Sequence, residues 1–135
     1  MYKNRSKGFT LIELLVVIAI IGILSAVVLA SLNTARQKGN DAAVQSNLNT
    51  IQTQAEIYYG DTSNTYGTVD STGDCTLAGT MFAANTTISS AVAQAKTANG
   101  NVALKCYVAT GGTAYAVASQ LSTSATTYWC VDSTG

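Results

Sequence analysis

The chain contains no proline and no histidine among its 135 residues, and only 10% of those residues are charged. The absence of histidine excludes histidine-based catalytic triads and histidine-ligated metal sites. The absence of proline means that no helix of the chain is kinked by a proline ring. The acidic residues are scattered along the sequence rather than paired. We therefore predict that the chain is not an enzyme and that it binds no metal or cofactor.

The positive charges are concentrated at the amino end, where three of the seven cations precede the ninth residue: Lys3, Arg5 and Lys7. A long apolar segment follows, and no side chain from residue 14 to residue 35 is charged. This run is long enough for the ~20 residues that a membrane-spanning helix requires. The positive-inside rule then keeps the basic end in the cytoplasm and places the rest of the chain outside the cytoplasmic membrane.

One carboxylate, Glu13, stands at the start of the apolar segment. An ionisable side chain within a membrane costs about 2.5 to 3.5 kcal/mol on insertion scales, so it is a candidate functional residue whose partner must be found. The alternative is a glutamate tolerated near the membrane interface, where protonation or snorkelling lowers this cost. A secretory signal peptide is not favoured, because residues 26–31 offer a poor cleavage site after the apolar segment.

A family resemblance lies around the only glycine of the basic stretch, in the order Lys7, Gly8, Phe9, Thr10, Leu11, Ile12 and Glu13. Together with the aliphatic run, these residues resemble the class III leader of type IV pilins and of the pseudopilins of type II secretion and competence systems. The resemblance implies that prepilin peptidase cuts between Gly8 and Phe9 and methylates the new amino group of Phe9. It also implies a cleaved leader at residues 1–8, a transmembrane and assembly helix at residues 9–35, and a globular head at residues 36–135.

The resemblance also implies a partner for the carboxylate. Cleavage leaves an ammonium group on Phe9, and Glu13 lies four residues further on, about one helical turn away. The carboxylate can pair with the amine of its own chain or with that of a neighbour, and in the resembled family the neighbour's amine is the partner during assembly. The implied partners are identical or related pilin subunits in a helical homopolymer, prepilin peptidase, the pilus assembly platform, and membrane lipid before assembly.

A helical apolar pattern continues beyond the membrane segment. Its apolar residues recur at spacings of four and three: Val44, Leu48, Ile51, Ala55 and Tyr58. Gly60 and Asp61 end the pattern, so we predict one helix over residues 9–59 whose second half is amphipathic. Gly39 and Asn40 form a weak point, because glycine is a poor helix former. The alternative is a helix that ends near Gly39 and is followed by a second one.

Downstream, the sequence predicts a loop, a short helix and a small sheet. Residues 61–79 are rich in Thr, Ser, Gly and Asp and predict an ordered loop, and residues 87–97 show helical apolar spacing. Alternating apolar residues predict three strands, at residues 101–110, 113–120 and 126–131. A two-residue turn at Gly111-Gly112 joins the first two. We expect an antiparallel meander covered by the amphipathic half of the long helix, and hence an α+β, pilin-like fold.

The chain has three cysteines, Cys75, Cys106 and Cys130, which cannot all pair within one chain. Outside the cytoplasm we expect them to be oxidised. We favour a disulfide between Cys75 and Cys106, which would link the loop to the first strand and leave Cys130 over. The alternative, Cys106 with Cys130, would cross between non-neighbouring strands of the predicted meander.

Two further sets of residues are given structural interpretations. Four aspartates lack the regular spacing of a Ca²⁺ loop and are interpreted as exposed loop residues: Asp61, Asp70, Asp74 and Asp132. Six tyrosines are interpreted as packing residues rather than as a stacking platform for DNA: Tyr58, Tyr59, Tyr66, Tyr107, Tyr115 and Tyr128. Removal of the leader leaves four cations and seven acids, a net charge of −3, so we expect no nucleic-acid partner.

The expected function is that of a structural subunit of a type IV pilus-like extracellular filament, polymerising through its N-terminal helix after leader cleavage. A pseudopilin of a type II secretion or DNA-uptake machine is the alternative within the same resemblance. A single-span, membrane-anchored binding domain is the alternative from another class. We expect a single-pass precursor in the cytoplasmic membrane with a cytoplasmic amino end, and a filament at the cell surface after assembly.

Overall fold

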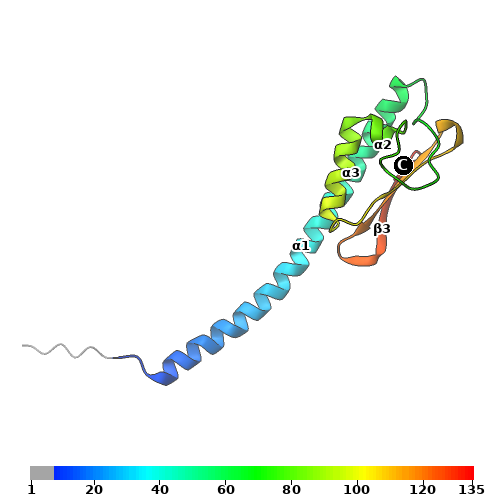
Figure 1. Cartoon of the computed structure of the whole chain (residues 1–135). Helices are drawn as coiled ribbons and strands as arrows, with labels where there is room; N and C mark the ends of the chain where they lie inside the picture. The colour runs from blue at the N-terminus through cyan, green and yellow to red at the C-terminus, as the bar shows by residue number, and fades with distance from the viewer. Residues whose placement is uncertain (1–7) are drawn as a thin grey trace, which may run out of the picture. The chain divides into compact units, whose positions relative to one another are not determined.

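The computed structural model describes residues 8–135, and its chain divides into two compact units. The first unit ends at Ala35 and the second is Arg36–Gly135. Figure 1 shows the elements, which are three α-helices, three strands and a short 3₁₀ turn: α1 (Leu11–Asp61), α2 (Met81–Ala84), α3 (Thr86–Ala98), β1 (Lys105–Val108), η1 (Thr110–Gly112), β2 (Tyr115–Leu121) and β3 (Ser124–Asp132). The predicted α+β class is confirmed.

Helix α1 is continuous over 51 residues, from Leu11 to Asp61, so the prediction of one long helix is confirmed. The alternative break near Gly39 is wrong. Gly39 is exposed, and a Cβ placed there would have no neighbour within 4 Å, so this residue relieves no crowding and only lowers helix propensity. The hydrogen bonds of the flanking turns outweigh that local cost.

The core of the second unit lies between α1, α3 and the sheet. Four of the five predicted α1 residues are fully buried, namely Val44, Leu48, Ile51 and Ala55, while Tyr58 is half-buried. They meet buried side chains from the other elements: Met81, Phe82, Ile88, Ala91, Ala95, Cys106, Val108, Tyr115 and Val117. Because burial of one large aliphatic side chain contributes roughly 1.5–3 kcal/mol, this contact accounts for much of the favourable folding energy.

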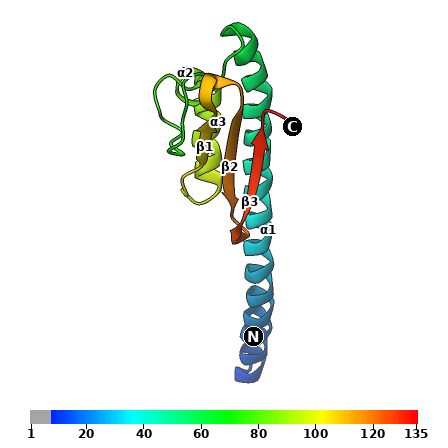
Figure 2. The same cartoon turned by 90° about the vertical axis from the view of Figure 1, so that its right-hand side faces the viewer.

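The sheet is the predicted antiparallel meander, in the order β1-β2-β3 (Figure 2). Strand β1 is shorter than the predicted 101–110, because the side-chain amide of Asn99 captures both backbone groups of Val102. Asn99 accepts a hydrogen bond from Val102 N at 2.9 Å and donates one to Val102 O at 3.0 Å. Strand pairing therefore begins only at Lys105, which lies opposite Ala118.

The predicted two-residue turn at Gly111-Gly112 is wrong. The connection is longer and contains η1: Ala109 N donates to Ala114 O at 2.9 Å, and Gly112 N donates to Ala109 O at 2.9 Å. Gly112 has a φ of +67°, and a Cβ there would come within 2.5 Å of Gly67 O. The glycine is therefore required by the close approach of the 65–67 loop rather than by a tight hairpin.

Other helix and strand boundaries also differ from the sequence predictions. Helix α1 covers Leu11–Asp61 rather than residues 9–59, and β2 covers Tyr115–Leu121 rather than residues 113–120. Helix α2 was not predicted, and α3 extends one residue beyond the predicted 87–97 at each end. The start of α3 is fixed by Asn85, whose side-chain oxygen accepts hydrogen bonds from Thr87 N at 2.9 Å and Ile88 N at 3.1 Å. This is a regular N-cap. Strand β3 extends beyond the predicted 126–131 at both ends.

The two edges of the sheet differ. Beyond β1, the loop residue Asp70 exchanges two backbone hydrogen bonds with Val108, of 2.9 and 3.1 Å, and Cys106 N donates to Gly73 O at 3.4 Å. This edge is therefore covered by the chain itself. Strand β3 forms the opposite edge, and the side chains of residues 125–130 are all exposed. Its outer edge has no strand partner among residues 8–135.

Candidate functional site at the start of the long helix

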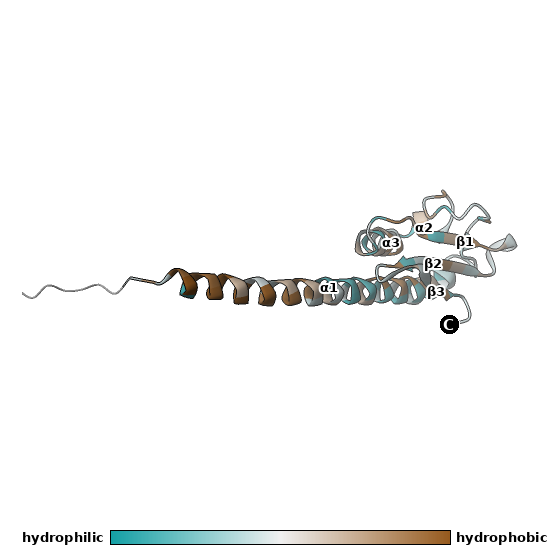
Figure 3. Cartoon of the chain, turned by 90° about the horizontal axis from the view of Figure 1, so that it is seen from below, coloured by the Kyte–Doolittle hydropathy of each residue, from teal (hydrophilic) through white to brown (hydrophobic). Residues whose placement is uncertain are grey.

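The first part of α1 is apolar around its whole circumference. Figure 3 shows the hydrophobic colour along this part and the polar colour along the second half of the helix. Sixteen large apolar side chains between residues 9 and 32 are exposed, and their exposed fractions range from 83% for Phe9 to 46% for Val17. Among residues 8–135, α1 is the one helix that is long and apolar enough to cross a membrane.

Glu13 and Thr10 form a reciprocal hydrogen-bonded pair at the first turn. Glu13 Oε2 accepts hydrogen bonds from Thr10 N at 2.8 Å and Thr10 Oγ1 at 2.7 Å. In return, Glu13 N donates to Thr10 Oγ1 at 3.3 Å. This Thr-x-x-Glu arrangement is a capping box, which satisfies backbone donors that a helix start leaves free. The carboxylate therefore has partners within its own chain.

Thr10 is a site residue whose role the sequence interpretation missed. The signal was present, because Thr10 precedes Glu13 by three residues and an apolar run follows. The hypothesis for Glu13 named the amine of Phe9 as its partner instead. That amine does not exist in the uncut chain, so the pairing of Glu13 with Phe9 stays a prediction.

The predicted processing junction lies directly before the helix. Gly8 and Phe9 are both exposed, and a Cβ at Gly8 would have no neighbour within 4 Å. Nothing in the described part of the chain therefore shields the bond between them. Lys7 and the rest of the predicted leader lie outside the described residues. Cleavage and methylation remain predictions.

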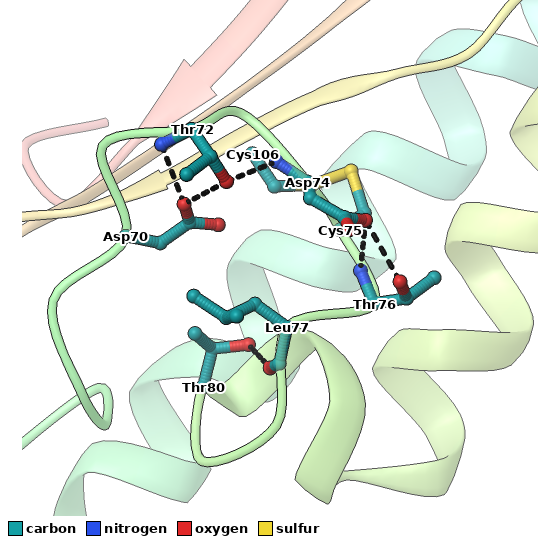
Figure 4. The surroundings of a disulfide bond; sticks show 8 residues. All are labelled: Asp70, Thr72, Asp74, Cys75, Thr76, Leu77, Thr80 and Cys106. Carbon is teal, nitrogen blue, oxygen red and sulfur yellow. Dashed lines mark hydrogen bonds between the residues drawn. A yellow bond between two sulfur atoms is a disulfide. The ribbon is translucent and has the colours of Figure 1, made fainter.

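A disulfide joins Cys75 to Cys106, the pair favoured from the sequence (Figure 4). Cys130 is a free, exposed thiol. The two Cα atoms are 4.9 Å apart, and the residues are separated by 31 positions in the chain. The bond ties the loop to β1 next to the backbone contact of Gly73 with Cys106. The loop and the sheet are thus linked by both covalent and hydrogen bonds.

Three aspartates each bind the threonine two residues later. Asp70 accepts from Thr72 N and Oγ1, both at 2.7 Å, and Asp74 accepts in the same way from Thr76, both at 2.8 Å (Figure 4). Asp132 repeats the arrangement at the end of β3. The interpretation of Asp70 as an exposed residue is wrong, because it is only 2% exposed: its backbone pairs with β1 and carries its side chain inward.

These contacts set the charge state of the exposed aspartates. The backbone N–H and then the hydroxyl of Thr76 lower the pKa of Asp74, and the positive charge of Lys105 lowers it further. The hydroxyl and then the backbone N–H of Thr134 lower the pKa of Asp132. Both carboxylates are therefore charged down to lower pH than ordinary aspartates.

Part of the tyrosine set packs in the core. The ring centroids of Tyr59 and Tyr66 are 4.6 Å apart, those of Tyr66 and Tyr115 are 4.8 Å apart, and Tyr115 also meets Phe82 edge-on. Tyr66 donates a hydrogen bond to Glu56 Oε1 at 2.8 Å. Burial, followed by this contact, raises the pKa of Tyr66 to about 12. These rings are packed against one another, as the packing interpretation requires.

Comparisons with known proteins agree with the resemblance drawn from the N-terminal residues. A family model described as the prokaryotic N-terminal methylation motif matches residues 3–29. The chain is 49% identical over 63 residues to the type IV wide pilus major component PilA4 of Thermus thermophilus, covering 47% of each chain. It is 32% identical over 60 residues to the type IV major pilin protein PilA of Myxococcus xanthus, covering 44% of this chain and 27% of that one.

A secretion protein is similar as well. The type II secretion system core protein G of Aeromonas hydrophila is 34% identical over 70 residues, covering 52% of this chain and 48% of its own. The chain thus spans about half or less of the length of these curated relatives. No solved structure matches the chain significantly. The matched relatives are named as pilus and secretion components.

Proposed function

We propose that the chain is a structural subunit of a type IV pilus-like filament, which polymerises through the first part of α1 after its leader is removed. The observation that carries this proposal is an apolar helix segment exposed on every side, with one carboxylate, Glu13, at its start. Such a segment requires lipid or other helices around it. The methylation motif and the similarity to a Thermus pilus component support the proposal that this segment packs against other subunits in a filament.

Packing and hydrophobic burial together favour assembly. In the membrane the segment is solvated by lipid, and helices associate there mainly through close packing. Once the subunit leaves the membrane, lipid no longer covers these side chains, and exposure to water costs about 25 cal/mol per Å² of apolar surface. Neighbouring helices of the same kind cover that surface in a filament core. The segment therefore holds the precursor in the membrane and the subunit in the filament.

Glu13 supplies direction to this otherwise non-directional contact. In the single chain its carboxylate is occupied by Thr10. In the filament it exchanges those bonds for the ammonium of Phe9 in an adjacent subunit, because an unpaired ammonium buried in an apolar core costs several kcal/mol. One carboxylate and one amine per subunit then define the axial register.

The remaining steps follow from the same motif. Prepilin peptidase cuts between Gly8 and Phe9, and a membrane-bound assembly platform extracts the subunit. The basic leader stays on the cytoplasmic side, and the second unit, Arg36–Gly135, lies outside the membrane. The chain acts through assembly and catalyses no reaction.

A pseudopilin role is the second candidate, because the chain is also similar to core protein G of a type II secretion system. The same helix would then build a short periplasmic filament rather than a long surface one. Filament length separates the two roles. A membrane-anchored domain that never polymerises would show neither filaments nor leader cleavage.

The decisive test is mass spectrometry of the mature chain together with electron microscopy of shed filaments. We expect a chain that begins with N-methylated Phe9 and that is the subunit of those filaments. A Gly8→Leu variant is the matched control and should accumulate as uncut precursor in the membrane. Retention of Met1 on the wild-type chain, or cleavage beyond Ala26, would overturn the proposal.

A further inference from the structure

Strand β3 carries an exposed aromatic and acidic surface. Tyr128 is 55% exposed, and the thiol of Cys130 is exposed as well. Tyr128 and Asp132 lie on the same face of the strand because they are separated by an even number of residues. Asp132 is the single charged residue of β3. Cys130 lies on that face as well, whereas Trp129 lies on the opposite face together with the buried Val131. We call Tyr128, Cys130 and Asp132 the β3 ridge.

A hollow of complementary character lies near β1 and α3. It has a volume of about 300 Å³ and is flanked by Lys96 of α3 and Lys105 of β1. Its apolar lining includes Cys75, Val92, Ala103 and Leu104. Asp74 also lines it, so two lysines and one aspartate give the hollow a charge of +1. We call this feature the lysine hollow.

The ridge and the hollow cannot meet within one copy. Lys105 in β1 and Cys130 in β3 are both paired with Ala118, on opposite sides of β2. The central strand therefore separates the hollow from β3. A contact between them must join two copies, and it uses different surfaces on each. Contacts of this heterologous kind repeat from copy to copy and generate rings or open helical filaments rather than two-fold dimers.

We propose that the β3 ridge of one copy docks in the lysine hollow of the next copy. Tyr128 is the aromatic anchor that such interfaces favour, and the apolar lining of the hollow receives it. Asp132 faces Lys96 and Lys105, so opposite charges meet across the contact. The proposal rests on the proposed filament function and names a second contact, outside the membrane helix.

The charges persist over the relevant pH range. The bonds from Thr134 lower the pKa of Asp132, so its carboxylate is ionised throughout neutral and mildly acidic conditions. Asp74 is the one negatively charged residue that lines the hollow, and its Oδ1 accepts hydrogen bonds from Thr76 N and Thr76 Oγ1. The two lysines are both exposed and free to turn toward an incoming carboxylate.

The native chain contains the probes that test this contact. Cys130 is an exposed thiol on the ridge, on the same face as Tyr128 and Asp132, and Lys96 is an exposed amine at the hollow. A short amine-to-thiol cross-linker applied to intact envelopes should join Cys130 of one copy to Lys96 of another. Because each copy carries both groups, the product should be a ladder of oligomers. Lys38, also exposed, is the internal control and should not be joined to Cys130 in the bands above the monomer.

A charge exchange provides the second measurement. Asp132→Lys should abolish the ladder. Adding Lys96→Asp and Lys105→Asp should restore the oligomers. Because Lys96 is then absent, these oligomers are detected with a thiol-to-thiol cross-linker and a Thr76→Cys substitution at the hollow. A ladder lost in the first variant and regained in the second excludes a simple folding defect. Cross-linked dimers that stop at two copies, or peptides joining Cys130 equally to Lys38, would overturn the proposed contact.

The outcomes also separate this contact from the filament proposal. Filaments whose subunits show no Cys130–Lys96 ladder would overturn the docking and leave the proposed function standing. A ladder in envelopes of cells that form no filaments would support the docking and count against the proposed function. Electron microscopy of the same preparations distinguishes the two cases.

Discussion

Asp41 Oδ1 in α1 accepts a hydrogen bond from the backbone N–H of Ser122, which lies 81 residues later in the chain. The other carboxylate oxygen accepts from the hydroxyl of Thr123. One buried carboxylate thus fixes the β2–β3 turn to the long helix. Ser122 is also bound to α3, because its hydroxyl donates to Ala98 O at 2.9 Å.

The first prediction is that Asp41→Ala lowers the free energy of unfolding of the full chain by about 1–3 kcal/mol, because it leaves a partly buried backbone donor without a partner. Trp129, the single tryptophan, reports unfolding by fluorescence in detergent. Asp61→Ala is the matched control, since Asp61 is exposed and should change stability by less than about 0.5 kcal/mol. Equal effects of the two substitutions would show that the Asp41 contact contributes little.

The second prediction is that Glu13→Leu abolishes filaments while insertion and leader cleavage continue. The substitution removes the one costly group from the apolar segment and with it the partner of the Phe9 amine. Glu13→Asp, whose reach is shorter, should give intermediate filament numbers by electron microscopy. Normal filaments made of Glu13→Leu subunits alone would contradict the pairing mechanism.

The third prediction concerns the helix start. Thr10→Val removes both the side-chain acceptor and the donor of the capping box and should destabilise the first turn of α1 by about 0.5–2 kcal/mol. Thr10→Ser, which keeps the hydroxyl, should behave like the wild type. Hydrogen exchange of the amides of residues 10–14 in detergent micelles measures the difference. Equal protection in the two variants would show that Thr10 does not cap the helix.

The fourth prediction concerns the disulfide. A peptide map without reduction should contain Cys75 joined to Cys106, and substitution of both by serine should cost about 3 to 4 kcal/mol by the chain-entropy estimate for a loop of this length. Cys130→Ser should leave stability unchanged, because that thiol is exposed and unpaired. A Cys106–Cys130 peptide would contradict the structure.

The fifth prediction concerns alkaline pH. The pKa of Tyr66 is raised from an ordinary value of 10.0 to about 12 in the folded chain. Between these values the unfolded chain has lost the phenolic proton and the folded chain retains it, so stability falls as the pH rises from 10 to 12. Tyr66→Phe should make this fall shallower in denaturant titrations. Burial also raises the pKa of Tyr115, so part of the fall should remain.

The features that the sequence predicted correctly depend on local periodicity. Val44, Leu48, Ile51 and Ala55 repeat with the helical period, and their burial follows from that repeat. The strand order followed from the short connections between strands, which favour a meander. The capping box is equally local, because Thr10 precedes Glu13 by three residues.

The features that the sequence did not predict depend on contacts between distant residues. The start of β1 is set by Asn99, whose amide also donates to Ser119 Oγ at 3.0 Å, 20 residues away. The conformation at Gly112 is set by the loop at Gly67. The spacing of residues along the chain does not predict such long-range contacts.

The capping box has a consequence for the supply of subunits. Because Thr10 occupies the carboxylate of Glu13 in a single chain, a subunit waiting in the membrane holds no bare anion. On the proposed function, adding a subunit exchanges bonds to Thr10 for a bond to the neighbour's amine, and removing it reverses the exchange. A subunit that returns to the membrane regains its own cap without help from another protein. On the proposed function, the membrane therefore holds subunits in a form that can be added to the filament and removed from it repeatedly.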